Sequence, residues 1–200
     1  MRFQWKLKDI LMIAVSAALF GVLYLGCVYA GVFLRGLLIP FGLERLAYEP
    51  FYGIFFMAGA FGIYVMRKPG TGVVAELLAA IIECLLGNFY GPIIILSGLV
   101  QGVGFELVIA LKRYKKFDRL TMIEAAVVCS VVTMGYNLVI SGYNLIAPSI
   151  LCLMLAVRLV SAVFFDAFTT MRLGDGLARA GVLKGYAVAE GMDQEPEEES

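Results

Sequence analysis

Residues 10–34 of the chain read ILMIAVSAALFGVLYLGCVYAGVFL, a run of 25 residues without a charged side chain. A helix needs about 20 apolar residues to cross the hydrocarbon core of a bilayer. The run is therefore long enough to form a membrane-spanning helix. It is also too long for the apolar core of a secretory signal peptide.

The overall composition supports a membrane protein. Of 200 residues, 61% are hydrophobic and 16% are charged, and the mean hydropathy is +0.88. A soluble domain contains roughly 25% charged residues, and a monomer of this size cannot hide so much apolar surface from water. A soluble globular enzyme is thereby excluded. The chain has no histidine and no P-loop, and its four cysteines lie far apart in apolar runs, so we expect free thiols and no metal site.

Five further apolar segments follow the first, separated by breaks such as the turn Arg67-Lys68-Pro69-Gly70. The predicted fold class is an all-α integral membrane protein, a six-helix transmembrane bundle within residues 1–186, with Pro50 in the first turn of the second helix. The last eleven residues hold six acids and no base, which predicts a disordered acidic tail over 187–200. The predicted spans are 10–34, 50–66, 71–86, 92–111, 121–140 and 146–171.

The distribution of basic residues predicts the orientation in the membrane. Thirteen lysines and arginines fall at the N-terminus, the 67–70 turn, the 112–120 loop and the C-terminal segment. The loops on the opposite side hold only Arg35 and Arg45. Cytoplasmic loops carry the excess of lysine and arginine, so both termini are predicted to be cytoplasmic in a multi-pass protein of the cell membrane.

Some ionisable side chains fall inside the predicted spans. A charge at the centre of a membrane helix costs roughly 2.5–3.5 kcal/mol, so ion pairs, neutralisation or a water-filled cavity must reduce the total. Arg158 is expected to pair with Glu76 or Glu106 as a structural lock, whereas Glu83, near the outer end of its helix, has no cation at its own level. These intramembrane residues are Glu76, Glu83, Glu106, Arg158 and Asp166.

The predicted outer loops are rich in tyrosines, amides and carboxylates. An interfacial aromatic belt explains part of this pattern. Carboxylates between aromatic walls also suit a flat, nitrogen-rich or cationic small molecule, which they bind by hydrogen bonds, stacking and cation–π contacts. The candidate binding residues are Glu83, Glu49, Tyr52, Asn88, Tyr90, Gln101, Tyr136, Asn137, Tyr143 and Asn144.

Two small residues, Ala14 and Ala18, stand four apart on the first predicted helix. Faces of this kind allow two helix backbones to approach closely. They serve either packing inside the bundle or docking of a partner protein.

Several short motifs are spread along the chain. They are Tyr48-Glu49-Pro50-x-Tyr52-Gly53, Arg67-Lys68-Pro69-Gly70, Ala75-Glu76, Glu83-x-x-x-Gly87-Asn88, Gln101-Gly102-x-Gly104-x-Glu106, Ser141-Gly142-Tyr143 and Val157-Arg158-Leu159-Val160-Ser161. Together these motifs resemble the YkoE type of substrate-binding (S) component of energy-coupling-factor (ECF) vitamin transporters. The likeness runs from about residue 5 to 186, and the block from 48 to 106 is its specific part. The Ala14/Ala18 pair is similar to the motif by which S components dock on their coupling subunit.

This resemblance implies a six-helix bundle that binds a vitamin, thiamine or its hydroxymethylpyrimidine (HMP) precursor, in an external cavity. It implies as partners a transmembrane coupling (T) component and two cytoplasmic ATPases, which use ATP to topple the S component. No cofactor is implied in this chain, no nucleic acid, and no enzymatic activity. Glu83 is the expected contact for the aminopyrimidine or the cation.

Two other classes of protein remain as alternatives. A self-sufficient permease or channel would line its path with Glu76, Glu83 and Glu106, but such proteins often carry internal repeats, and none is seen between the two halves. An intramembrane enzyme is disfavoured because the chain lacks histidine, a Ser/Lys motif and a paired-carboxylate motif.

Overall fold

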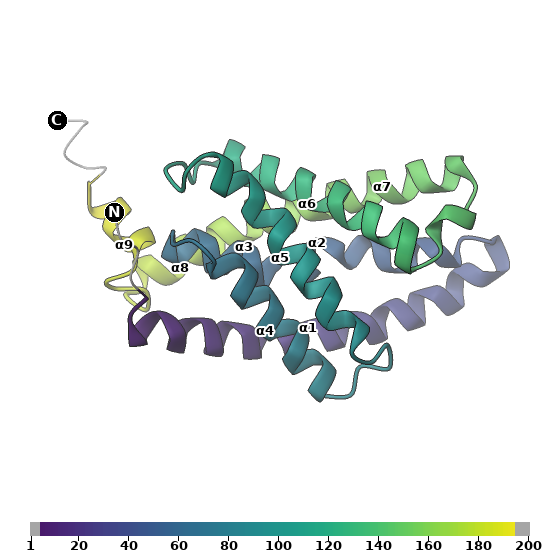
Figure 1. The fold of residues 1–200 in the computed structure, drawn as a ribbon, viewed down its shortest axis with the longest axis horizontal. Coiled ribbons are helices and arrows are strands. Elements are labelled where there is room, and N and C mark those ends of the chain that lie inside the picture. The colour runs from purple at the N-terminus through teal and green to yellow at the C-terminus, as the bar shows by residue number, and fades with distance from the viewer. Residues whose placement is uncertain (1–4, 195–200) are drawn as a thin grey trace.

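The computed structural model describes residues 5–194, and all regular elements in this range are helices (Figure 1). The predicted all-helical fold is therefore confirmed. The elements are α1 (Leu7–Leu38), η1 (Ile39–Phe41), η2 (Glu44–Phe51), α2 (Tyr52–Phe55), α3 (Met57–Met66), α4 (Thr71–Leu85), α5 (Ile93–Leu111), α6 (Arg119–Ile140), η3 (Tyr143–Leu145), α7 (Pro148–Ala162), the π-helix η4 (Val163–Thr169), α8 (Thr170–Arg179) and α9 (Ala187–Gln194).

Five helical stretches among the described residues are long and apolar enough to cross a membrane. They are Leu7–Phe41, Glu44–Met66, Ile93–Leu111, Arg119–Ile140 and Pro148–Arg179. The predicted span 71–86 corresponds to α4, which has 15 residues. At about 1.5 Å per residue this helix is about 22 Å long, shorter than the hydrocarbon core of about 30 Å.

The start of the second predicted span is wrong. Pro50 lies inside the 3-10 helix η2, not in the first turn of a membrane helix. The helical stretch begins at Glu44 and reaches Met66 only through changes of helix type at α2 and α3. Proline removes a backbone donor, and a 3-10 helix followed by a short α-helix accommodates this local irregularity.

The turn at 67–70 forms as the sequence predicts. Arg67 adopts a left-handed conformation with φ of 52° at the end of α3, and Gly70 has φ of 83° at the start of α4. Glycine reaches such positive φ values at little steric cost. The chain therefore reverses within four residues and packs α4 against α3.

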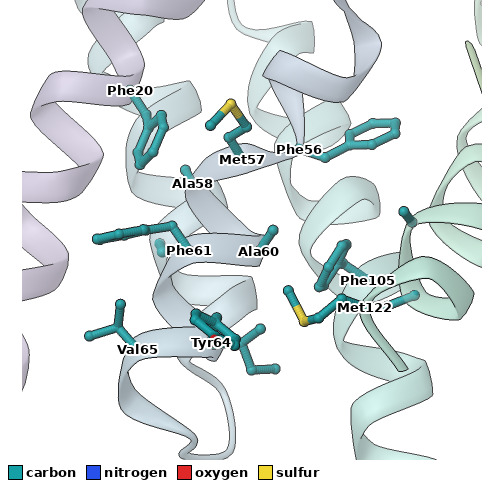
Figure 2. Packing of buried hydrophobic residues seen from close by; sticks show 14 of the residues in the cluster. Phe20, Phe56, Met57, Ala58, Ala60, Phe61, Tyr64, Val65, Phe105 and Met122 are labelled. Carbon is teal, nitrogen blue, oxygen red and sulfur yellow. The ribbon is translucent and has the colours of Figure 1, made fainter. Parts of the chain in front are cut away.

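The centre of the bundle is α3, all ten residues of which are buried. Figure 2 shows its side chains Met57, Phe61 and Tyr64 packed among residues of neighbouring helices, including Phe20 of α1 and Phe105 of α5. A helix that is apolar on every face belongs in the interior of a bundle. The sequence of α3, MAGAFGIYVM, has this character.

Small residues bring α4 and α5 together. A Cβ atom added at Gly102 would lie 2.7 Å from Val73 Cα, and one at Gly98 would lie 2.6 Å from Ala80 Cβ. Both distances are too short for carbon atoms, so glycine is needed at these positions. The 98/102 pair is thus used for packing inside the bundle.

The first eight residues of the predicted tail, Ala187–Gln194, form α9, so the prediction of disorder is wrong there. Val188 of α9 is 1% exposed and belongs to the hydrophobic core. Before α9, the Tyr186 hydroxyl donates to the Lys8 carbonyl at 2.8 Å, which places α9 at the same end of the molecule as the start of α1 (Figure 1). The remaining predicted tail residues, 195–200, lie outside the described residues.

Candidate binding cavity

A cavity of about 460 Å³ is lined by residues that include the end of α1 and the start of η2. These segments lie at the end of the bundle opposite α9 (Figure 1). The cavity volume falls within the range of small-molecule sites. Residues from α1, η2, α2, α4, α5, α6 and η3 contribute to it. The lining residues are Tyr24, Val28, Arg35, Glu44, Arg45, Tyr48, Tyr52, Phe55, Ala80, Glu83, Asn88, Tyr90, Ile93, Ile94, Ser97, Gln101, Tyr136, Asn137, Ile140, Ser141 and Tyr143.

Glu83 lies in the cavity wall near the end of α4 and is only 5% exposed. Asn88 Nδ2 donates to Glu83 Oε1 at 2.6 Å, and Asn88 Oδ1 accepts from the Tyr90 backbone N–H at 2.8 Å. Gly87, with φ of 101°, allows the chain to turn between them. Among the described residues, Oε2 of Glu83 accepts no hydrogen bond and the carboxylate has no ion-pair partner. This oxygen is therefore open to a ligand.

Aromatic rings form much of the cavity wall. Tyr48 and Tyr90 meet edge to face, with centroids 6.0 Å apart. Phe55 lies edge to face against both Tyr24 and Tyr52, with centroids 5.6 and 6.0 Å apart. These contacts hold the rings in fixed orientations, so a flat ligand would meet pre-arranged aromatic surfaces.

Tyr52 is held from two sides. Asn137 Nδ2 donates to the Tyr52 hydroxyl at 2.5 Å, and the guanidinium carbon of Arg158 lies 3.5 Å from the Tyr52 ring centroid. Such a short distance is typical of a guanidinium stacked on an aromatic face. The ring thus separates the cavity from the buried arginine behind it.

Arg158 does not pair with Glu76 or Glu106, so that prediction is wrong. Its Nε and Nη2 donate to the two carboxylate oxygens of Glu49 at 2.7 and 2.9 Å, and both side chains are fully buried. Glu49 also accepts from the Tyr143 hydroxyl at 3.3 Å. Because α7 packs against η2, Glu49 lies inside the protein beside Arg158 and does not line the cavity.

Glu76 and Glu106 bind backbone groups. Glu76 accepts from the Gly59 backbone N–H at 2.7 Å and from the Tyr24 hydroxyl at 3.2 Å. Glu106 accepts from the backbone N–H groups of Gly70 and Val73, the latter at 2.9 Å, and from Tyr114. Glu106 thereby satisfies N–H groups at the start of α4 that lack helical partners.

Gln101 links the cavity to Glu76. With its amide nitrogen facing α4, Gln101 donates to Glu76 Oε1 at 3.3 Å and to the Phe55 carbonyl at 3.2 Å. Asp166 lies deeper, on the π-helix η4, and both of its carboxylate oxygens are buried without a hydrogen-bond partner among the described residues.

Most predicted binding residues line this one cavity, but Glu49 and Asn144 do not. Asn144 is exposed beside it on η3. Sequence reasoning missed the lining residues Arg35, Glu44 and Arg45. The signal for the two arginines was present, since they are the only basic residues in the loops on that side of the predicted bundle.

Ala14 and Ala18 lie on the exposed face of α1, whereas Ala17 between them is buried. The pair is therefore not used for packing inside the bundle. No group of three or more His, Cys, Asp or Glu side chains that could hold a metal ion occurs in the described part of the chain.

Comparisons with known proteins agree with this architecture. Residues 8–132 match the family described as the permease component of an ABC-type cobalt transport system. A Bacillus subtilis (strain 168) protein named as an HMP/thiamine permease, YkoE, is 38% identical over 185 residues, covering 92% of this chain and 90% of the relative.

A solved structure shows the same fold. It is a crystal structure of an S-component of an ECF transporter, with a TM-score of 0.91 and 36% identity over 98% of this chain and 96% of that one. These relatives are transport proteins, not enzymes. The chain is thus a multi-pass membrane protein with the ECF S-component fold, and it belongs to the YkoE-type substrate-binding components of ECF transporters.

Proposed function

We propose that this chain captures thiamine or its HMP precursor for an ATP-driven vitamin importer of the cell membrane. The observation that carries the proposal is Glu83, whose Oε2 is open to a cavity walled by tyrosines. Thiamine joins a flat aminopyrimidine to a cationic thiazolium, and HMP is the pyrimidine alone. Glu83 accepts hydrogen bonds from the aminopyrimidine or pairs with the cation, while the rings of Tyr52 and Tyr90 stack on the ligand.

The proposed arrangement has six helices in the membrane and both termini in the cytoplasm. The distribution of thirteen basic residues on one side against two on the other supports this orientation. Although α4 is short, it lies between two polar turns and packs along α1 and α5. In this orientation the cavity opens on the external side, where a scavenged vitamin arrives.

The proposed partners are a transmembrane coupling (T) component and two cytoplasmic ATPases. The exposed Ala14 and Ala18 face of α1 docks on the coupling component, because small side chains allow close approach of a second helix. ATP hydrolysis by the partners topples the bundle so that the cavity opens inward. This chain contains no P-loop of its own.

Calorimetric titration of the purified chain in detergent with thiamine and with HMP tests the proposal. A hydrogen bond to a charged group contributes about 1.5–3 kcal/mol, so Glu83→Gln should weaken binding roughly 10- to 150-fold. Tyr90→Ala should also weaken it by removing an aromatic wall. The matched control is Glu124→Gln, a carboxylate paired with Lys112 away from the cavity.

Two results would contradict the proposal. If Glu83→Gln and Tyr90→Ala both bind as tightly as the parent, the cavity is not the binding site. If the purified chain alone transports the vitamin or an ion across liposomes, it is a self-sufficient permease using Glu76, Glu83 and Glu106.

A further inference from the structure

Two arginines lie in the exposed part of the cavity. Arg35, in the last turn of α1, and Arg45, in η2, both line the cavity and are both exposed. Neither forms an ion pair within the described residues. Glu44 is the acidic lining residue next to them, so this end of the cavity has a net positive charge.

Basic residues are rare on the side of the bundle where these two arginines lie. Of the sixteen lysines and arginines in the chain, only Arg35, in the last turn of α1, and Arg45, in η2, lie at the end of the bundle that we propose to be external. The positive-inside rule leaves external loops poor in basic residues. Since the two exceptions both face one cavity, membrane orientation does not explain them, whereas a ligand does.

Arg35 and Arg45 both act electrostatically on the Tyr90 hydroxyl in the cavity wall. Burial raises the pKa of the Tyr90 hydroxyl, and both arginines oppose that rise. Tyr90 itself contacts Tyr48 and is hydrogen-bonded through its backbone to Asn88, the partner of Glu83. The two arginines, Tyr90 and Glu83 all line this one cavity.

Along α1, the lining residues Tyr24, Val28 and Arg35 mark the length of the cavity. Arg35 lies eleven positions after Tyr24, which is about 17 Å along the helix axis. Tyr24 is buried and Arg35 is exposed. The cavity thus has a carboxylate and aromatic rings in its buried part and two guanidinium groups in its exposed part.

We propose that the cavity recognises a phosphate monoester of its pyrimidine-type cargo, with Arg35 and Arg45 binding the phosphate while Glu83 binds the base. This rests on the proposed function and names the preferred form of the substrate. Guanidinium groups bind phosphate oxygens through paired, charge-assisted hydrogen bonds. A cation alone satisfies only the Glu83 end and is repelled by the arginines, whereas a phosphorylated base complements both ends.

The test compares matched ligand pairs that differ only in the phosphate: thiamine with thiamine monophosphate, and HMP with its monophosphate. Affinities are measured by calorimetry on the full chain in phospholipid-free detergent. We expect each ester to bind roughly tenfold more tightly than its parent, as for one added charged hydrogen bond. The preference should shrink as salt is raised, because the arginines are exposed.

The variant Arg35→Gln/Arg45→Gln should bind ester and parent with equal affinity. Thiamine itself should bind the double variant at least as tightly as it binds the wild type, because the arginines that repel its cation are gone while Glu83 is kept. Arg172→Gln, an exposed arginine of α8 outside the cavity, is the matched control and should keep the full preference.

Three outcomes would overturn the inference while leaving the proposed function intact. In the first, thiamine and HMP bind, but their phosphate esters bind no more tightly. In the second, the Arg35→Gln/Arg45→Gln variant still prefers the esters. In the third, added phosphatidylglycerol displaces the ester, which would assign the arginines to a lipid headgroup phosphate. If none of the four ligands binds the wild type, both the inference and the proposed function are wrong.

Discussion

The fully buried pair of Glu49 and Arg158 gives the sharpest prediction for stability. Arg158→Met removes two hydrogen bonds to Glu49, of 2.7 and 2.9 Å, and one to the Thr133 hydroxyl at 3.3 Å. The Glu49 carboxylate then keeps only the Tyr143 hydroxyl at 3.3 Å. Removing one partner of a buried ion pair costs about 3–5 kcal/mol, because the other charge stays buried and uncompensated. Glu49→Gln should cost a similar amount by isolating Arg158.

The double variant Glu49→Gln/Arg158→Met should recover much of this loss, because no unpaired charge remains. For a chain of this size, 1 kcal/mol corresponds to about 2–4 °C in melting temperature, so each single variant should unfold about 6–20 °C below the wild type. Thermal unfolding in detergent measures all three. Glu124→Gln breaks the partly exposed pair with Lys112 and serves as the control, with an expected loss below about 1 kcal/mol.

Two results would contradict this role of the ion pair. The first is that the single variants melt no lower than Glu124→Gln, which would mean that the pair does not hold η2 to α7. The second is that the double variant loses the sum of both single effects, which would mean that the two side chains act independently.

Three further predictions concern packing, docking and a buried acid. Gly102→Ala should lower the melting temperature by about 2–12 °C, because the added Cβ would meet the Val73 backbone and overpacking costs about 1–3 kcal/mol. The control is Gly135→Ala, which has open space around it and should not lower the melting temperature. Ala14→Leu/Ala18→Leu should abolish cellular uptake but leave calorimetric vitamin binding unchanged; lost binding would place the pair in the bundle core. Asp166→Asn should melt at or above the wild-type temperature, because no hydrogen bond to the carboxylate is lost; a drop of several degrees would reveal a partner.

The helices were predictable because lipid imposes a length and a composition on each. The 25-residue uncharged run from Ile10 becomes the middle of α1, and the turn at Arg67 and Gly70 ends α3 where the sequence places it. Pro50 was misplaced because the pattern of apolar residues does not distinguish a 3-10 helix from an α-helix. Helix α9 was missed because the acids from Glu190 onward dominate the sequence pattern, whereas Val188, in the first turn of the helix, is buried in the core.

The cavity was partly predictable because tyrosines and amides in short outer loops can reach only one end of the bundle. Glu83, Asn88 and Tyr90 come together as expected. The partner of Arg158 was not predictable, because depth in the membrane does not define which face of α7 meets which neighbour. Glu49 is 109 residues away and appeared to belong to an exposed loop.

Native mass spectrometry tests the role of Glu83 most directly, on wild-type and Glu83→Gln proteins purified from cells and incubated with thiamine and HMP. We expect one retained pyrimidine-type molecule per wild-type chain and a large loss of occupancy in Glu83→Gln. Equal occupancy in the two proteins, or a wild-type protein that retains neither compound, would contradict the claim that Glu83 holds the cargo in this cavity.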